Sequence, residues 1–203
     1  FIKALDDAGV QYDLDQQNAS GDQSVCQTVA SKFANDGKDL ILAIATPAAQ
    51  AMAGAVTDTP VLITAVTDPA ESGLVDTNEV PGGNVTGTSD LTPVAEQIDL
   101  LQKVLPDAKK IGILYSTSEV NSETAIAEYK AAAPDYGFEI VEGAVTSTAD
   151  IPLAADSILE KVDCLNNLTD NTVVSSLPMI LDKASKKNIP VFGSEVEQVK
   201  IGC

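Results

Sequence analysis

Short apolar runs alternate along this chain with longer segments in which apolar residues recur every three or four positions. The clearest run, Leu40–Ile44, has the length of a buried strand, and an alanine-rich segment follows it directly. Between them, Thr46 is a good N-cap and Pro47 is well placed at the first helical position. The pattern therefore predicts a strand that ends at a helix N-terminus, where free N–H groups and the helix dipole favour an anion such as a carboxylate.

The same strand-to-helix pattern recurs from one end of the chain to the other. Strands are predicted at 11–15, 40–44, 61–66, 84–88, 111–115, 138–144, 163–168 and 189–193. Helices are predicted at 1–9, 23–35, 47–56, 92–105, 121–133, 149–161 and 173–186. This alternation is typical of parallel βαβ units. It falls into two blocks on either side of residue 90, so we expect an α/β fold with two Rossmann-like lobes of parallel sheet and a ligand cleft between them.

The composition suits such a fold and argues against two classes of binding partner. Hydrophobic residues make up 44% of the 203 positions and aromatic residues 4%, so the core is expected to consist of Val, Ile, Leu and Ala between helices and strands. The formal charge is −18 and the pI is near 4.1. These values argue against binding to nucleic acid or to an anionic membrane surface, because the chain offers no basic surface.

The residue types that are missing also limit the chemistry. Histidine is absent, which removes the commonest general base and metal ligand. Cys26, Cys164 and Cys203 have no CxxC spacing, and we expect the first two to be small core residues. No glycine-rich phosphate loop follows a strand, and no calcium-loop pattern occurs. The sequence therefore predicts neither a cofactor nor a metal site.

Polar side chains gather where the predicted strands end. The candidate ligand-binding residues are Thr46, Ala48, Ala49, Thr67, Asp68, Asp90, Ser118, Asn121, Ser122, Asp170, Asn171 and Glu195. Ligands of open α/β sheets bind outside the carboxyl ends of the strands, which favours one shared site. The alternative is that each cluster only caps the helix that follows, for which Ser, Thr, Asp and Asn are preferred. Several clusters hold more polar side chains than one cap needs, and Ser118-Glu119 before Asn121 is an example.

These junctions carry five motifs in a fixed order: ATPAAQAMA, AVTDPAESGLV, PGGNVTGTSDLTPVAEQIDLLQKVLPDAKKIGILYSTSEVNS, LTDNTVVSSL and IPVFGSEVEQVKIG. Together they resemble the substrate-binding proteins of ABC transporters, and in particular the TrpX-like branch of aromatic amino acid binders. The resemblance covers nearly the whole chain. It implies the type I periplasmic-binding fold, with one lobe at 1–89, a second at 90–195, and the start of a return crossing at 196–203. In the family, a further strand and half a helix precede this region and carry part of the ligand site, so we expect the first lobe to be incomplete at its start.

The resemblance also implies a function. Members of the family are receptors, not enzymes. They sit outside the cytoplasmic membrane, often as lipoproteins, and deliver a small ligand to a permease. We therefore expect a monomeric receptor for an amino acid such as Trp, Phe or Tyr.

The ligand groups can be assigned to the two lobes as hypotheses. The first lobe is expected to hold the ligand carboxylate through the Thr46 hydroxyl, the N–H groups of Ala48 and Ala49, and Thr67. Asp170 is predicted to bind the ligand ammonium, with Asn121, Asp90 and Glu195 nearby, because a buried ammonium must be paired. If Asp170 only caps the next helix, the ammonium site moves to Asp90 or Glu195.

Two other function classes share this lobe layout. An amino-acid racemase of α/β fold needs a pair of cysteines at strand ends; here Asp170 stands in such a place, and Cys164 lies at the start of its strand. The sensor domain of a transcription repressor needs a basic helix-turn-helix, and this sequence contains none.

Overall fold

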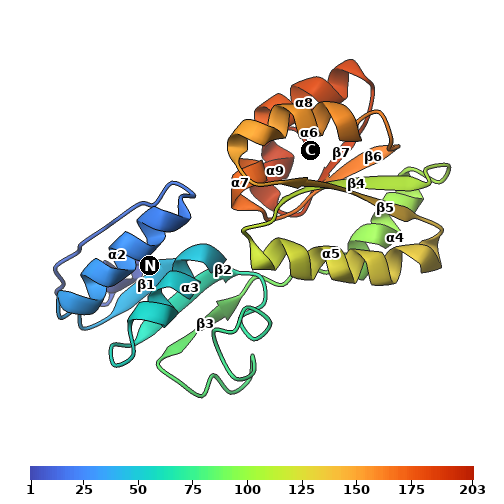
Figure 1. Ribbon diagram of the computed structural model, residues 1–203. Helices are drawn as coiled ribbons and strands as arrows, with labels where there is room; N and C mark the ends of the chain where they lie inside the picture. The colour runs from blue at the N-terminus through green and yellow to red at the C-terminus, as the bar shows by residue number, and fades with distance from the viewer.

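The computed structural model describes residues 1–203 and contains two parallel sheets. Strands β1 (Ile41–Ile44), β2 (Val61–Val66) and β3 (Val85–Ser89) form the first sheet, in that order. The second sheet has the order β5-β4-β6-β7, from β4 (Lys110–Ser116), β5 (Glu139–Val145), β6 (Cys164–Asn167) and β7 (Val191–Gly193). Figure 1 shows the two sheets in separate lobes, so the predicted α/β fold with parallel sheets is confirmed.

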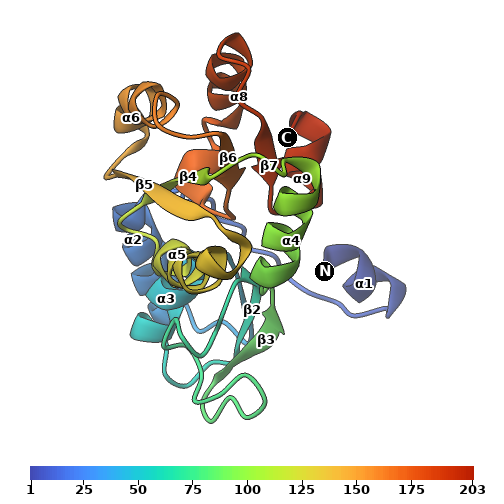
Figure 2. The same ribbon diagram turned by 90° about the vertical axis from the view of Figure 1, so that its right-hand side faces the viewer.

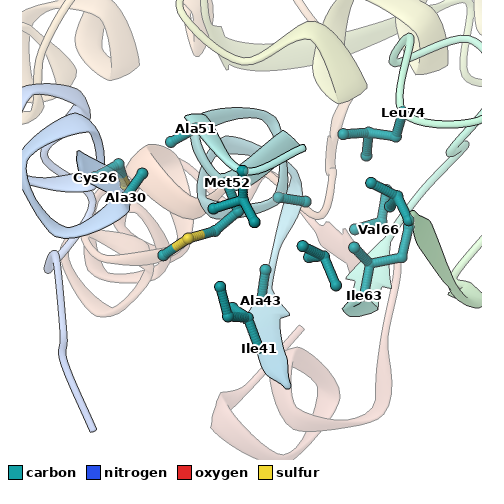
Figure 3. Packing of buried hydrophobic residues seen from close by; sticks show 13 residues of the cluster. Cys26, Ala30, Ile41, Ala43, Ala51, Met52, Ile63, Val66 and Leu74 are labelled. Carbon is teal, nitrogen blue, oxygen red and sulfur yellow. The ribbon is translucent and has the colours of Figure 1, made fainter. Parts of the chain in front are cut away.

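In the first lobe, helices α2 (Gln23–Asn35) and α3 (Thr46–Ala55) cover one face of the sheet. Alternate residues of β1, such as Ile41 and Ala43, point into this core, where Met52 of α3 lies against them (Figure 3). Cys26 of α2 belongs to the same core, as predicted. Alanine, valine and isoleucine make up most of this core, as the composition predicts.

In the second lobe, helices cover both faces of the sheet. Helices α4 (Val94–Val104) and α5 (Val120–Ala132) pack on one face with Ile111 and Cys164. Helices α6 (Ile151–Ile158) and α8 (Leu177–Lys186) pack on the other with Leu114. A short 3₁₀ helix, η1 (Ala133–Tyr136), extends α5. Another, η2 (Thr148–Asp150), precedes α6 and carries a capping box between Ser147 and Asp150.

One predicted helix is wrong. The segment 173–186 is two helices, α7 (Asn171–Val174) and α8, separated at Ser175 and Ser176. The cause is Pro178, which lacks an N–H and whose ring would collide with the carbonyl of residue 174 in a continuous helix. Proline is instead accommodated in the first turn of α8. As a result, α7 is a single short turn that starts at the end of β6.

One predicted strand is also wrong. Residues 11–15 are extended but pair with no neighbouring strand, so they count as a loop. A strand needs a partner for its backbone groups, and the local sequence pattern cannot supply one. The carboxylate of Asp15 instead accepts hydrogen bonds from Lys32 at 2.7 Å and Lys38 at 3.1 Å, which ties the loop to the end of α2.

Two peripheral helices complete the chain. Helix α1 (Ile2–Asp7) has no buried residue and lies to one side of the lobes (Figure 2). Helix α9 (Val196–Ile201) follows β7 and packs against it. The sequence assigned 196–203 to the start of a return crossing, and that assignment stays a prediction. No helix of this chain has both the length and the hydrophobicity that crossing a membrane requires.

Candidate functional site

The junction between β1 and α3 has a strained backbone and no charge. Ala45 is the N-cap, with φ 75° and ψ 154°, a region that is essentially restricted to glycine. Thr46 is therefore the first helical residue and Pro47 the second, one position earlier than the sequence predicts. No side chain caps this helix. The first N–H groups of α3 are thus left to other partners.

The candidate residues of this junction differ in whether they reach the cavity. Ala48 lines a cavity, whereas Thr46 and Ala49 are buried beside it. The N–H of Ala49 donates to the carbonyl of Ala45 at 3.0 Å. The prediction that the Ala49 N–H is free for a carboxylate is therefore wrong. Thr46 and the Ala48 N–H remain candidates.

The neighbouring strand brings Thr67 to the second lobe. Strand β2 carries an irregularity between Ile63 and Val66, and Ala65 within it has φ 53°. Beyond this point, Thr67 is buried, and its Oγ1 lies 3.4 Å from Oγ1 of Thr169, which follows β6. A second contact crosses between the lobes where Gln23 Nε2 donates to the Ser118 carbonyl at 3.2 Å. The two lobes therefore meet at the carboxyl ends of β1, β2, β4 and β6.

The junction between β6 and α7 is rich in acceptors. Asp170 is completely buried and caps α7, because its Oδ1 accepts from the Val173 N–H at 2.8 Å. Its Oδ2 accepts from the Ser116 N–H and from the Ser122 hydroxyl, both at 2.7 Å. The hydroxyl of Ser122, which is also a candidate residue, is therefore used as a hydrogen-bond donor to Asp170. The capping role of Asp170 is present in the structure, and its ligand role stays a prediction.

Glu119 is a second buried carboxylate at the same helix end. Its Oε2 accepts from the N–H and the Nδ2 of Asn171, at 3.0 and 2.7 Å. Its Oε1 accepts from the N–H and the hydroxyl of Thr172, both at 2.9 Å. Only 3% of Glu119 is exposed. The sequence marked Ser118-Glu119 as part of a polar cluster but gave Glu119 no ligand role.

The two carboxylates act on each other. Burial, and after it the charge of Glu119, raises the pKa of Asp170 above its ordinary value, while the hydrogen bonds to Asp170 oppose that rise. None of the lysine ion pairs of this chain involves either acid. The second lobe therefore holds negative charge at this point without a cation of its own.

Asn121 adds an unused acceptor to this cluster. Its Nδ2 donates to the Thr169 carbonyl at 3.3 Å and lies 3.5 Å from Glu119 Oε2. Its Oδ1 is the one buried side-chain polar atom without a hydrogen-bond partner. Such orphaned acceptors are rare in folded proteins because they cost about 1–3 kcal/mol each.

A cavity of about 860 Å³ joins the two junctions. The first lobe lines it with Ala45, Pro47 and Ala48, and the second with Ser118, Glu119, Asn171 and Thr172. It continues along the free edge of β1 toward residues 13–21. Its volume lies within the range of about 300–1,000 Å³ that is usual for small-molecule sites.

Among the candidates, only Ala48, Ser118 and Asn171 line this cavity, and three others lie apart from both junctions. Asp68 organises its own loop, because its Oδ1 accepts from the N–H groups of Ala70 and Glu71. Asp90 is exposed in the segment that crosses between the lobes. Glu195 caps α9 by accepting from the Gln198 N–H at 3.1 Å. The structure thus brings Ser118, Asn121, Ser122, Asp170 and Asn171 together, and it leaves Asp68, Asp90 and Glu195 outside that group.

Neither the cysteines nor a metal-binding group belongs to the polar cluster at the strand ends. Cys164 lies in the core at the amino end of β6, opposite the polar end, and burial raises its pKa to about 12. All three cysteines are free. No group of three or more Cys, Asp or Glu side chains is arranged to hold a metal ion. The cavity offers the uncapped start of α3 on one wall and the carboxylate of Glu119 on the other.

Comparison with known proteins places this arrangement in a family. The family model described as "ABC transporter substrate binding protein" matches residues 1–203. A "Tyrosine-binding protein" from Clostridioides difficile (strain R20291) is 43% identical over 207 residues, which span the whole of this chain and 60% of that protein. This chain therefore spans less than two thirds of that relative's length.

Two solved structures differ in how their lobes compare with this chain. The ABC domain from Streptococcus pneumonia in complex with L-Trp is 38% identical, with a TM-score of 0.95 over 99% of this chain and 69% of that one. The ligand-free, open structure of a substrate binding protein with adhesive properties from Clostridium difficile is 44% identical, but its TM-score is 0.64, over 98% of this chain and 69% of that one. The protein with the lower TM-score is the more similar in sequence, so sequence divergence does not explain the lower score. The lobes of this chain are placed as in the L-Trp complex.

Proposed function

The chain belongs to the ABC transporter substrate binding protein family, and from that premise we propose that it forms the ligand-binding part of a receptor for a free amino acid. One observation carries the proposal: a single cavity, lined mainly by the first lobe, is bounded by the uncapped start of α3 and, on the side of the second lobe, by the buried carboxylate of Glu119. A zwitterion presents the complementary pair of charges.

The ligand carboxylate is assigned to the first lobe. The N-terminus of α3 has no side-chain cap and no acidic residue in its first turn, so its positive end is available to an anion. Thr46 and the N–H of Ala48 are the groups that would hold it, and Thr67 closes the site from the adjacent strand. No arginine is needed for this, and the chain contains none.

The ligand ammonium is assigned to the second lobe. Glu119 and Asp170 supply two carboxylates without a lysine partner. Ser118, Asn121, Ser122 and Asn171 surround them, and these residues are the proposed polar wall. A buried ammonium group would offset the desolvation of the carboxylates, since charges taken out of water are stable only when paired.

An aromatic side chain on the ligand is supported by the relatives. One is named as a tyrosine-binding protein, and another was solved with L-Trp. At 43% and 38% identity over the whole chain, they favour the same ligand class here. The choice between Trp, Phe and Tyr is a question for binding measurements.

The cellular setting follows from the family. Receptors of ABC importers work outside the cytoplasmic membrane, and we propose that location, with a permease as partner and a lipid anchor on the full-length protein. We further propose that the receptor is a monomer, which sedimentation velocity would test. A species of twice the monomer mass at micromolar concentration would contradict it.

The experiment for the proposed function is a thermal-shift screen of the full-length protein against the common L-amino acids. A ligand that binds only the folded state stabilises it by about 2.7 kcal/mol at a hundredfold excess over the dissociation constant. We expect Trp, Tyr or Phe to raise the melting temperature most. If no amino acid shifts it, the proposal is wrong.

Two rival functions have separate tests. A racemase would convert a pure L-amino acid to its D-isomer, which chiral chromatography detects. A sensor domain would change the DNA affinity of an attached regulator when ligand binds. We expect neither result. The absence of a cysteine pair at the strand ends of the cavity favours binding over racemisation, because that chemistry needs two opposed thiols.

A further inference from the structure

We infer that Glu119, rather than Asp170, is the charge that recognises the ligand ammonium, with Asn121 Oδ1 as the acceptor that the ammonium completes. The inference rests on the proposed function and deepens it. It concerns which of two neighbouring buried carboxylates binds the ammonium group of the ligand. Local sequence favours Asp170, since it follows the strand end directly, whereas the geometry points to Glu119.

The first argument is access. Glu119 lines the cavity together with Ser118, Asn171 and Thr172, whereas Asp170 does not. Asp170 is completely buried, and its two oxygens accept from three donors of its own lobe, at 2.7 to 2.8 Å. These donors belong to β4, α5 and α7, so Asp170 holds together the elements that carry the wall. It is a positioning residue.

The second argument is charge. Glu119 keeps a 3% exposed carboxylate in a region where no lysine pairs with it. Hydrogen bonds from Asn171 and Thr172 satisfy its oxygens, but these donors are neutral and leave the negative charge in place. A buried anion without a counter-ion is costly, and a cationic ligand that arrives on this wall removes that cost. The ligand's ammonium is the cation that the proposed function provides.

The third argument is the orphaned acceptor. Asn121 is 95% buried and directs its Nδ2 toward Thr169 and Glu119, which leaves Oδ1 without a donor. An amide oxygen next to a carboxylate is a suitable pair of acceptors for an ammonium group, which has three hydrogens to donate. Glu119 is the member of this pair that lines the cavity, and Asn121, which does not line it, supports Glu119 from 3.5 Å away.

The test combines variants of the protein with variants of the ligand. Calorimetry on the full-length protein measures L-tyrosine and L-tryptophan, and then their des-amino analogues, which keep the ring and the carboxylate. In Glu119→Gln, we expect the affinity for the amino acids to fall on the order of 30-fold or more. The affinity for the des-amino analogues should stay within about twofold of the wild-type value, because they lack the ammonium group that Glu119 binds.

Two further variants keep the test decisive if Glu119→Gln folds poorly. Asn121→Leu retains the size of the side chain and removes the acceptor, so it should weaken the amino acids and spare the des-amino analogues. Glu123→Gln is the matched control, since it removes an exposed acid from the first turn of α5. It should leave all four affinities unchanged.

The outcomes separate the inference from the function it rests on. If Glu119→Gln weakens amino acids and des-amino analogues equally, Glu119 is structural and the inference is overturned. If it changes neither while Asp170→Asn selectively weakens the amino acids, Asp170 is the ammonium partner and the inference is likewise overturned. Wild-type protein that binds neither amino acid contradicts the proposed function itself, and the inference falls with it.

Discussion

The two strand-to-helix junctions of this chain end in opposite ways. At the end of β1, helix α3 begins without a side-chain cap, behind an alanine held in a conformation suited to glycine. At the end of β6, helix α7 begins under two buried carboxylates, Asp170 and Glu119. The first junction leaves donors unused, and the second carries more negative charge than its short helix needs. The difference indicates that capping alone does not explain the second junction, and that the two ends together suit a ligand with both charges.

The largest expected effect is on the stability of the capped junction. Asp170→Ala leaves the donors of Ser116, Ser122 and Val173 buried without an acceptor. We expect a loss of about 3–5 kcal/mol in the free energy of unfolding, since each unsatisfied buried group costs about 1–3 kcal/mol. Urea denaturation measures it. A loss below about 1 kcal/mol would show that the junction relaxes easily and that the cap is unimportant.

A second prediction uses pH to isolate the charge of Asp170. Its pKa is raised in the folded protein, so protonation favours folding. Its contribution to stability is therefore full below its ordinary pKa and is lost as the pH rises through the raised value. Asp170→Asn lacks this dependence. The stability of the wild type relative to Asp170→Asn should accordingly increase as the pH falls from 7 toward 4.

Asp163 provides the control with the opposite sign. It lies just before β6, and its Oδ2 accepts from the N–H groups of Lys109 and Lys110 at 2.7 and 2.8 Å. These hydrogen bonds lower its pKa. Its stabilising contribution is present above its ordinary pKa of 3.8 and is lost as the pH falls below that value, so the wild type should lose stability relative to Asp163→Asn only below about pH 4. Equal pH dependence of the two differences would contradict the account of β6.

The smallest predicted effect tests the strain at the uncapped junction. Ala45→Gly should stabilise the protein by about 1 kcal/mol, because glycine adopts φ 75° and ψ 154° without the cost that alanine bears. In a chain of this size, the melting temperature should rise by about 2–4 °C. The matched control is Ala127→Gly at an exposed site in α5, which should cost about 1 kcal/mol. If both substitutions destabilise, Ala45 is not strained.

The sequence predicts these junctions well where their causes are local. The strand that ends at Ile44 and the helix after it are read from an apolar run, a proline and an alanine-rich segment, and the structure has both within a residue or two. The break between α7 and α8 was also visible as Pro178, although the apolar pattern on either side outweighed it. The capping box before α6 is another feature with a local cause, because Ser147 and Asp150 are only three positions apart.

Non-local features could not be read in this way. Residues 11–15 have a strand's pattern but no partner, and pairing is decided elsewhere in the chain. The meeting of Glu119 with Asn171 depends on β6 pairing with β4 and not with β5, which precedes it in sequence. Fifty-two positions separate those two residues. The sequence therefore identifies the candidate acids, but only the order of the strands determines which of them lie together at the strand ends.

The most direct test of the account measures how the two charges of the ligand contribute to binding. Calorimetry on the full-length protein would compare L-tyrosine with tyramine, which lacks the carboxylate, and with 3-(4-hydroxyphenyl)propionate, which lacks the ammonium. If α3 binds the carboxylate and the carboxylates of the second lobe bind the ammonium, L-tyrosine binds and each analogue is weaker on the order of 30-fold or more. An analogue that binds as tightly as L-tyrosine would contradict the assignment of its missing charge to this cavity.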